Sequence, residues 1–290
     1  MASMRSVIEC MSIAEIVDHY DTFIVDQWGV LHDGRSGFPD ARQSLQYLKR
    51  RGKTVAVLTN SGKSGEDNLR RLGRYGFEAD AFDLLLTSGD MAIEYINDRL
   101  PRRKIFLVDY TLDTVMRERL KCSSFVTRID EADMILLSGW SDSMGWKTYE
   151  PIFATAALNG LPMLCSNADT IGFFEGKMEE GPGAIAARFS QMGGSVTLFG
   201  KPDRSFFEAC LARLGKSDKR RSIVIGDSYA TDICGAANAG IDSLLIAMGL
   251  HRDAFSAADV RTVVEQLSAS FSGGAVYPNY IMAHLRTLSF

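Results

Sequence analysis

The chain has 290 residues, a formal net charge of −4 at pH 7 and an isoelectric point near 5.7. This acidic balance provides no basic surface for nucleic acid or an anionic membrane, so we expect neither as a partner. No apolar run reaches membrane-spanning length, residues 1–10 lack a signal-peptide core, and the five scattered cysteines form no C-x-x-C pair, so a cytoplasmic location is expected. The length suits two domains.

Apolar runs of strand length alternate with helical patterns over the first 90 residues. In chain order we expect a short helix at 13–19, a strand at 22–25, a helix at 40–51, a strand at 54–58, a helix at 64–75 and a strand at 84–86. Asp40 would cap the 40–51 helix and Gly52 would end it. Leu45 and Leu48 of that helix would face inward. The order β, α, β, α, β is typical of a parallel sheet with right-handed crossovers.

The alternation starts again near residue 91 and continues, without a long linker, to about residue 194. Its expected elements are helices at 91–100, 114–120, 148–158 and after Gly181-Pro182-Gly183 to residue 191, and strands at 105–108, 134–137 and 163–165. This middle third therefore predicts a domain inserted into the first one. The outer sheet would resume with strands at 196–199, 223–225 and 244–246, and residues 268–278 would form a loop.

Polar side chains stand where four of these strands end. Asp26 and Thr59 end the first two, Lys201 follows the third, and Asp227 and Asp232 follow the fourth. Taken singly, each is better explained as a turn residue, a solvated lysine or a helix cap. Together they gather at one edge, because ligands bind outside the carboxyl ends of parallel strands. Three clustered carboxylates repel one another unless a cation neutralises them.

This set of residues suits phosphoryl transfer. A carboxylate such as Asp26 can attack phosphorus and form an aspartyl-phosphate. Mg²⁺ prefers oxygen ligands and would bridge Asp26, Asp227 and the phosphoryl group. Thr59 and backbone amides would hold the phosphoryl oxygens, and Lys201 would balance the negative charge. Gly200-Lys201 is not part of a P-loop, because the earlier glycine is missing and Pro202 replaces the Ser or Thr.

Four ordered motifs resemble those of the haloacid dehalogenase superfamily. They read Asp26-Gln27-Trp28-Gly29-Val30-Leu31, Thr59-Asn60-Ser61, Gly200-Lys201-Pro202 and Gly226-Asp227-Ser228-Tyr229-Ala230-Thr231-Asp232-Ile233. About 30 residues separate the first two motifs and about 140 the second and third. This spacing resembles class IIA, which includes p-nitrophenyl, pyridoxal-phosphate and sugar-phosphate phosphatases. The resemblance implies a doubly wound parallel-sheet, Rossmann-like core (1–90 and 195–290) with an inserted α/β cap (91–194).

The same resemblance implies a Mg²⁺-dependent phosphatase that acts on a small phosphorylated metabolite. Asp26 would be the nucleophile, with Thr59 and Lys201 as further catalytic residues. The metal site would comprise Asp26, the backbone carbonyl of Trp28, Asp227 and Asp232, with Asp232 behind the other three, orienting the ligands or Lys201. The expected substrate-binding residues are Asn60, Ser61, Asn167 and Asp169. The oligomeric state is left open, with a homodimer through the cap as the candidate assembly.

Trp28 departs from the family pattern, because the family's phosphatases have there a second Asp that protonates the leaving group. General acid–base help, worth roughly 10²–10⁴-fold, should be missing at that position. His32 or Asp33 on the adjacent loop would be the substitutes, although a plain loop role is the better interpretation of His32. The alternative function is a phospho-ligand-binding or metal-binding protein that has lost catalysis. A dehalogenase is disfavoured, because Asp227 and Asp232 indicate a metal.

Overall fold

The computed structural model describes residues 7–109, 114–120, 123–174, 177–270 and 275–287. The chain forms two compact units. The first consists of Met1–Thr59, Arg71–Leu86 and Lys201–Phe290, and the second of Asn60–Arg70 and Thr87–Gly200. The chain therefore passes between the units four times, once within helix α2 (Gly65–Arg74). Over the described residues, every helix is too short or too polar to span a membrane.

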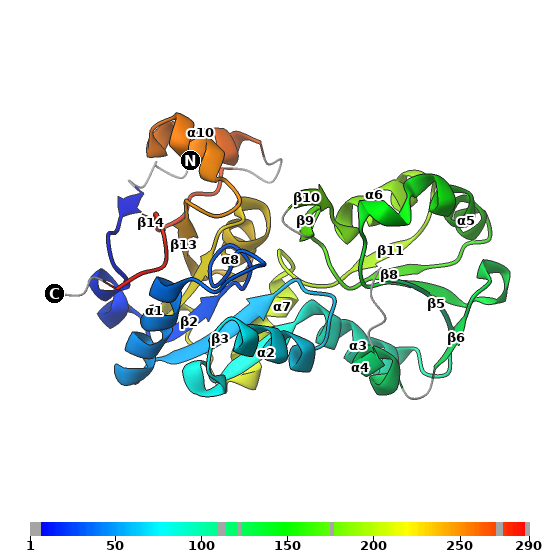
Figure 1. The fold of residues 1–290 in the computed structure, drawn as a ribbon, viewed down its shortest axis with the longest axis horizontal. Helices are drawn as coiled ribbons and strands as arrows, with labels where there is room; N and C mark the ends of the chain where they lie inside the picture. The colour runs from blue at the N-terminus through cyan, green and yellow to red at the C-terminus, as the bar shows by residue number, and fades with distance from the viewer. Residues whose placement is uncertain (1–6, 110–113, 121–122, 175–176, 271–274, 288–290) are drawn as a thin grey trace. The chain divides into compact units, whose positions relative to one another are not determined.

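A seven-stranded sheet forms the centre of the first unit, in the order β1-β14-β13-β12-β2-β3-β4 (Figure 1). Its strands are β1 (Ile8–Glu9), β2 (Thr22–Val25), β3 (Thr54–Thr59), β4 (Leu84–Thr87), β12 (Ser222–Gly226), β13 (Asp242–Ile246) and β14 (Tyr280–Met282). The pairings from β1 through to β3 are parallel. The strand order reverses at β2 and β12, since β3 and β4 follow β2 on one side while β13 and β14 follow β12 on the other. The predicted doubly wound parallel sheet is confirmed.

The central strands of this sheet are buried on both faces. In β13, Leu244 belongs to an apolar cluster that includes Leu45 and Leu48, as predicted for those two leucines. The neighbouring Leu245 belongs to a different cluster, with Val264. Burial on both faces explains why the strands are apolar throughout rather than alternating. The helices of this unit are α1 (Pro39–Arg50), α2 in part, α7 (Arg204–Arg213), α8 (Cys234–Ala239), α9 (Arg252–Ala257) and α10 (Val260–Ala269).

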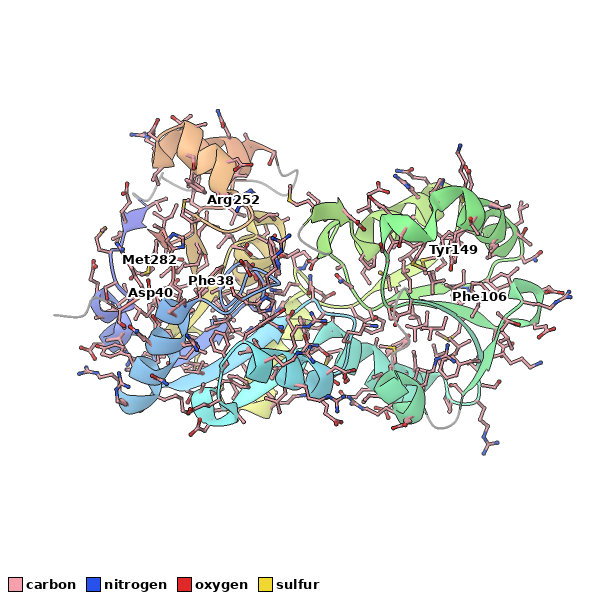
Figure 2. The ribbon with its side chains drawn as sticks, viewed as in Figure 1. Phe38, Asp40, Phe106, Tyr149, Arg252 and Met282 are labelled. Atoms are coloured by element: carbon pink, nitrogen blue, oxygen red, sulfur yellow. The ribbon has the colours of Figure 1, made fainter. Side chains whose placement is uncertain are left out.

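Two local predictions for the first unit differ from the structure. The 13–19 segment is helical, but it forms two short 3-10 turns, Ile13–Glu15 and Val17–His19, instead of one helix. Ser12 and Glu15 form a capping box at the start of the first turn. Helix α1 begins at Pro39, and no side chain caps it, so Asp40 lies inside the first turn (Figure 2). Proline replaces a cap at this position because its fixed φ already suits the first helical residue.

The predicted loop near the end of the chain, the 268–278 tract, begins slightly later than expected. Helix α10 continues to Ala269, and residues 270 and 275–278 form neither helix nor strand, as predicted. Residues 271–274 of that tract lie outside the described residues, as does Cys122, while the other four cysteines are free thiols. Gly52 ends α1 as predicted, with a φ of 70° that suits glycine.

The second unit has its own parallel sheet of five strands, in the order β11-β8-β7-β5-β6. The strands are β5 (Lys104–Val108), β6 (Ser124–Val126), β7 (Met134–Leu137), β8 (Met163–Cys165) and β11 (Val196–Leu198), with a separate antiparallel pair of β9 (Ile171–Phe174) and β10 (Lys177–Glu180). The helices are α3 (Ser88–Arg99), α4 (Thr114–Arg119), α5 (Trp146–Leu158) and α6 (Pro182–Gln191). Phe106 and Tyr149 lie in an apolar cluster of this unit (Figure 2).

Strand β11 is placed differently from the prediction. It was expected to resume the outer sheet, but it pairs with β8, with Val196 opposite Met163. Leu198 is 50% exposed, as suits an edge strand with a partner on one side only. A short apolar run indicates a strand but carries no information about its partner, which explains the error.

Candidate active site

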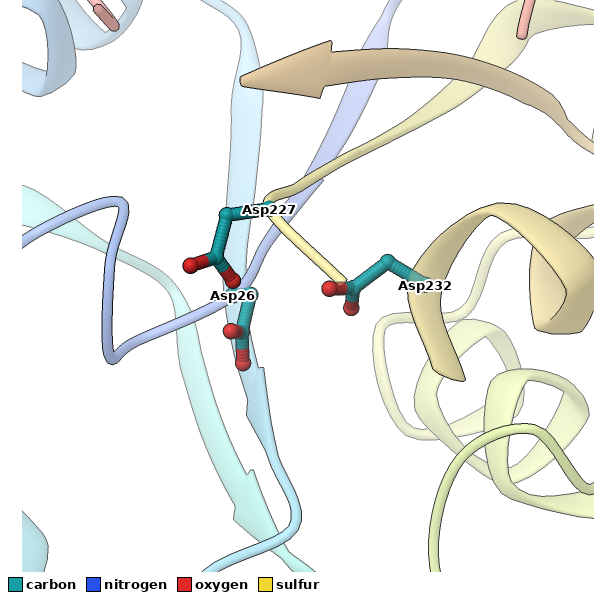
Figure 3. Close-up of side chains that lie close together, drawn as sticks. All are labelled: Asp26, Asp227 and Asp232. Atoms are coloured by element: carbon teal, nitrogen blue, oxygen red, sulfur yellow. The ribbon is translucent and has the colours of Figure 1, made fainter. Parts of the chain in front are cut away.

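Three aspartates meet where the order of the seven-stranded sheet reverses. Asp26 follows β2 and Asp227 follows β12, and these strands are neighbours in register, with Val25 opposite Ile225. Asp232 comes from a single π-helical turn, Tyr229–Ile233, and accepts a hydrogen bond from the Ser228 N–H (3.1 Å). One carboxylate oxygen from each aspartate lies within 4.8 Å of the others (Figure 3). The predicted convergence of these strand ends is therefore present.

Lys201 provides a cation inside this cluster. Its Nζ lies 2.5 Å from Oδ1 of Asp26 and 2.7 Å from Oδ1 of Asp232. The lysine is only 2% exposed, so these ion pairs are shielded from solvent. Asp232 thus orients Lys201, one of the two roles expected for it. Thr59 ends β3, next to β2 in the sheet, and is 7% exposed.

Glycines let the backbone pack directly against the carboxylates. A Cβ atom at Gly29 would lie 1.8 Å from Oδ2 of Asp227, and one at Gly249 would lie 2.3 Å from the same oxygen. A Cβ atom at Gly226 would lie 2.0 Å from Cγ of Asp232. The Leu250 N–H, next to Gly249, donates to Oδ2 of Asp227 (2.7 Å). The contact of residues 249–250 with Asp227 was not predicted from the sequence. Its trace in the sequence is Gly249, a glycine shortly after β13.

The electrostatics of the cluster favour the binding of a cation. Burial raises the pKa of Asp26 to about 7; Lys201 opposes this shift and Asp232 adds to it. Burial, together with the charges of Asp26 and Asp232, raises the pKa of Asp227 well above its ordinary value. When all are ionised, three carboxylates and one ammonium leave a formal charge of −2. Clustered carboxylate oxygens with surplus negative charge fit a divalent cation.

The loop after Asp26 holds the residues that were considered as replacement acids. His32 is 2% exposed, and its Nδ1 accepts a hydrogen bond from the Gly34 N–H (2.9 Å). Asp33 accepts from the backbone N–H groups of Arg35 (2.8 Å) and Ser36 (2.7 Å). Both side chains therefore have structural roles within the loop. The half-buried Trp28 side chain stands two residues after Asp26, and its carbonyl remains a predicted metal ligand.

The predicted substrate-binding residues lie in the second unit. Asn60 donates to Oδ1 of Asp169 (2.8 Å), whose N–H donates to Oδ1 of Asn167 (2.9 Å). Ser61 accepts a hydrogen bond on its carbonyl oxygen from the Ser88 hydroxyl (3.1 Å). The structure brings Asn60, Asn167 and Asp169 together and holds Ser61 in the same loop, while their contact with a substrate stays a prediction.

A buried ion pair also holds the loop that contains Asn60 and Ser61. Nζ of Lys63 lies 2.6 Å from Oδ2 of Asp109, which follows β5. The side chains are 11% and 3% exposed. Neither residue was singled out from the sequence, because nothing in the local pattern links a lysine before α2 to the end of a distant strand.

Comparison with known proteins identifies the family. Residues 23–119 match the model of the haloacid dehalogenase-like hydrolases, and residues 198–270 match a second model described as HAD-hydrolase-like. An acid sugar phosphatase from Staphylococcus aureus is 27% identical over 236 residues, which cover 80% of this chain and 88% of the relative.

Solved structures share the fold. A haloacid dehalogenase-like hydrolase from Brucella suis superposes with a TM-score of 0.80 at 26% identity, covering 95% of this chain and 99% of that one. NagD from Escherichia coli superposes with a TM-score of 0.69 at 19% identity, covering 93% and 98%. Together with the acidic site at the predicted motifs, these matches show that the chain belongs to the haloacid dehalogenase-like hydrolases.

Proposed function

We propose that this chain is a Mg²⁺-dependent phosphatase that hydrolyses a small phosphate monoester through an aspartyl-phosphate on Asp26. The buried cluster of Asp26, Asp227, Asp232 and Lys201 is the observation that carries this proposal. An acid sugar phosphatase among the relatives supports a small phosphate ester as the substrate.

In the proposed reaction an oxygen of Asp26 attacks phosphorus, and the bond from phosphorus to the alcohol oxygen breaks. The leaving alcohol takes up a proton, and water then attacks the phosphorus of the aspartyl-phosphate, which releases inorganic phosphate and restores the carboxylate. Lys201 holds Asp26 in a fixed orientation through its 2.5 Å contact. Its ammonium also stabilises the negative charge of the phosphoryl group.

Asp26, Asp227 and the Trp28 carbonyl would hold Mg²⁺, which prefers oxygen ligands. When bound, the ion would neutralise charge on the phosphoryl oxygens. The raised pKa of Asp26, about 7, leaves part of this carboxyl protonated near neutral pH. Nearby positive charge favours the carboxylate, the form needed for attack.

Trp28 shapes the expected substrate range. No carboxylate stands at its position to protonate the leaving oxygen, and His32 and Asp33 make hydrogen bonds within their own loop. An aryl phosphate, whose leaving group needs little protonation, should therefore react much faster than an alkyl or sugar phosphate. The missing acid corresponds to roughly 10²–10⁴-fold in rate.

A panel of esters tests this function. Aryl, pyridoxal, glycerol and sugar phosphates are assayed with Mg²⁺ and with EDTA, and Asp26→Asn provides the control that lacks the nucleophile. We expect Mg²⁺-dependent hydrolysis that disappears in Asp26→Asn. In Trp28→Asp, provided that the variant folds and binds Mg²⁺, alkyl phosphates should gain up to about 10²–10⁴-fold.

Two results would contradict the proposal. Hydrolysis that persists in Asp26→Asn would exclude the aspartyl-phosphate route. A wild-type chain that binds Mg²⁺ but hydrolyses no ester, with Trp28→Asp equally inactive, would favour the alternative of a phospho-ligand-binding protein.

A further inference from the structure

The buried imidazole of His32 has no part in the proposed chemistry, yet it lies in the same loop as Asp26. We call residues 26–37 the Asp26 loop. Within it, the N–H of Gly29 donates to the carbonyl of His32 (2.8 Å), and that of Leu31 to the carbonyl of Gln27 (2.9 Å). The side chains of Gln27 and His32 are each 2% exposed, so their hydrogen bonds form away from solvent.

The hydrogen bonds of the ring determine where its proton resides. Nδ1 accepts from the Gly34 N–H at 2.9 Å, so this nitrogen carries no proton. In a neutral ring the proton is then on Nε2, which lies 3.1 Å from the nitrogen position of the Gln27 carboxamide. Two N–H groups cannot bond to each other, so the carboxamide takes the reverse orientation and accepts through Oε1. In the unreversed orientation Oε1 is buried without a hydrogen-bond partner among the described residues.

Tyr75 packs against the His32 ring. The two rings lie 4.7 Å apart between centroids, and the Tyr75 hydroxyl donates to the carbonyl of Gly34 (2.7 Å). A Cβ atom at Gly37 would lie 2.3 Å from the Tyr75 carbonyl oxygen, so the end of the Asp26 loop is packed against this residue. Burial, with a contribution from the charge of Arg71, lowers the pKa of His32 to about 4, which keeps the ring neutral at pH 7.

We propose that His32 is a positioning residue: its neutral ring, protonated at Nε2, holds the Gln27 carboxamide and thereby fixes Asp26 and Trp28, the residues on either side of Gln27. The catalytic consequence rests on the proposed phosphatase function, whereas the ring geometry does not. Both ring nitrogens are occupied by the loop itself, so His32 does not replace the missing acid.

Long-range nitrogen–proton NMR correlations of the wild-type chain test the geometry without any substrate. At pH 7 we expect the His32 signals of a neutral ring protonated at Nε2, with exposed His19 and His284 as internal references. A ring protonated at Nδ1, or at both nitrogens, would overturn the proposal. If the wild type hydrolyses no ester, the proposed function fails but this measurement still decides the His32 assignment.

Kinetics test the positioning role. His32→Phe keeps a ring against Tyr75 but removes both hydrogen bonds, and Gln27→Met removes the shared bond from the other side. Each should lower kcat on an aryl phosphate by about 10- to 100-fold, because the nucleophile Asp26 is misplaced. KM should be nearly unchanged, because neither variant removes a contact with the substrate. The double variant should be no worse than either single one. His284→Phe, at an exposed position, should leave kcat unchanged.

Added imidazole separates positioning from proton transfer. We expect it to leave the His32→Ala rate unchanged, because a free imidazole cannot rebuild the loop. Recovery of kcat with imidazole would show that His32 transfers a proton and would overturn the proposal. Wild-type kcat in folded His32→Phe and Gln27→Met would overturn it as well.

Discussion

Replacing Asp227 with Asn should stabilise the metal-free protein while it removes the metal site. The three carboxylate oxygens lie within 4.8 Å of one another, and two ionised carboxylates at this largest separation repel by about 3.5 kcal/mol at an effective dielectric constant of 20. Lys201 and partial protonation offset part of this cost, so we expect Asp227→Asn to gain about 1–3 kcal/mol. The Asn side-chain oxygen can still accept the hydrogen bond that the Leu250 N–H donates to Asp227.

Thermal unfolding at pH 8, with EDTA and with Mg²⁺, measures this effect. The variant should melt higher than the wild type in EDTA, by about 2–4 °C per kcal/mol. Mg²⁺ should raise the Tm of the wild type and leave that of the variant nearly unchanged. Asp253→Asn, whose parent side chain is 97% exposed, is the matched control and should change neither value. An Asp227→Asn variant that melts below the wild type in EDTA would refute the idea that surplus negative charge destabilises the site.

Three further changes have defined outcomes. Lys201→Met leaves two buried carboxylates without their lysine partner, so the free energy of unfolding measured in urea should fall by about 3–5 kcal/mol and activity should be lost. A fall in unfolding free energy of less than about 1 kcal/mol would contradict this. Gly249→Ala should weaken Mg²⁺ binding in calorimetry, because its Cβ would lie 2.3 Å from Asp227, and unchanged affinity would argue against this crowding. The pKa of His32 falls from 6.5 to about 4 on folding, so its contribution to stability is complete above pH 6.5 and lost as the pH falls towards 4. The difference in unfolding free energy between wild type and His32→Asn should thus narrow by up to about 3 kcal/mol as the pH falls from 7.5 to 4.5. A difference that stays constant over this pH range would exclude the lowered pKa of His32.

Most of the longer strands could be predicted from the sequence, but the short strands β1, β6 and β14 were not, and the partner of one predicted strand was wrong. Strands β2, β12 and β13 are buried on both faces and read as continuous apolar runs. Strand β11 has the same local signal, yet its hydrogen bonds go to β8. Backbone pairing depends on the path of the whole chain, and a three-residue segment does not encode it. The pair of β9 and β10 was missed because Gly172 interrupts the strand pattern.

The acidic site could be predicted because its residues stand directly after strands. Asp26 and Asp227 occupy neighbouring strand ends in a parallel sheet, so topology alone brings them together. Gly249 and Leu250 act through backbone atoms, and a backbone contact leaves little trace in residue type. The surroundings of His32 depend on Tyr75, a residue from a different segment, so the sequence alone left its role open.

The division of the chain also constrains recombination between relatives. Residues 60–70 belong to the second unit, although residues 71–86, which belong to the first, separate them from the rest of it. A fragment that starts at residue 87 would contain Asp109 without Lys63, its partner in an ion pair. It would also contain Asp169 without Asn60, which donates a hydrogen bond to it. Asp109, whose side chain is 3% exposed, would then lose the ammonium that neutralises it. A chimaera that exchanges this unit must therefore carry two separate segments, and a single crossover near residue 87 should yield a poorly folded protein.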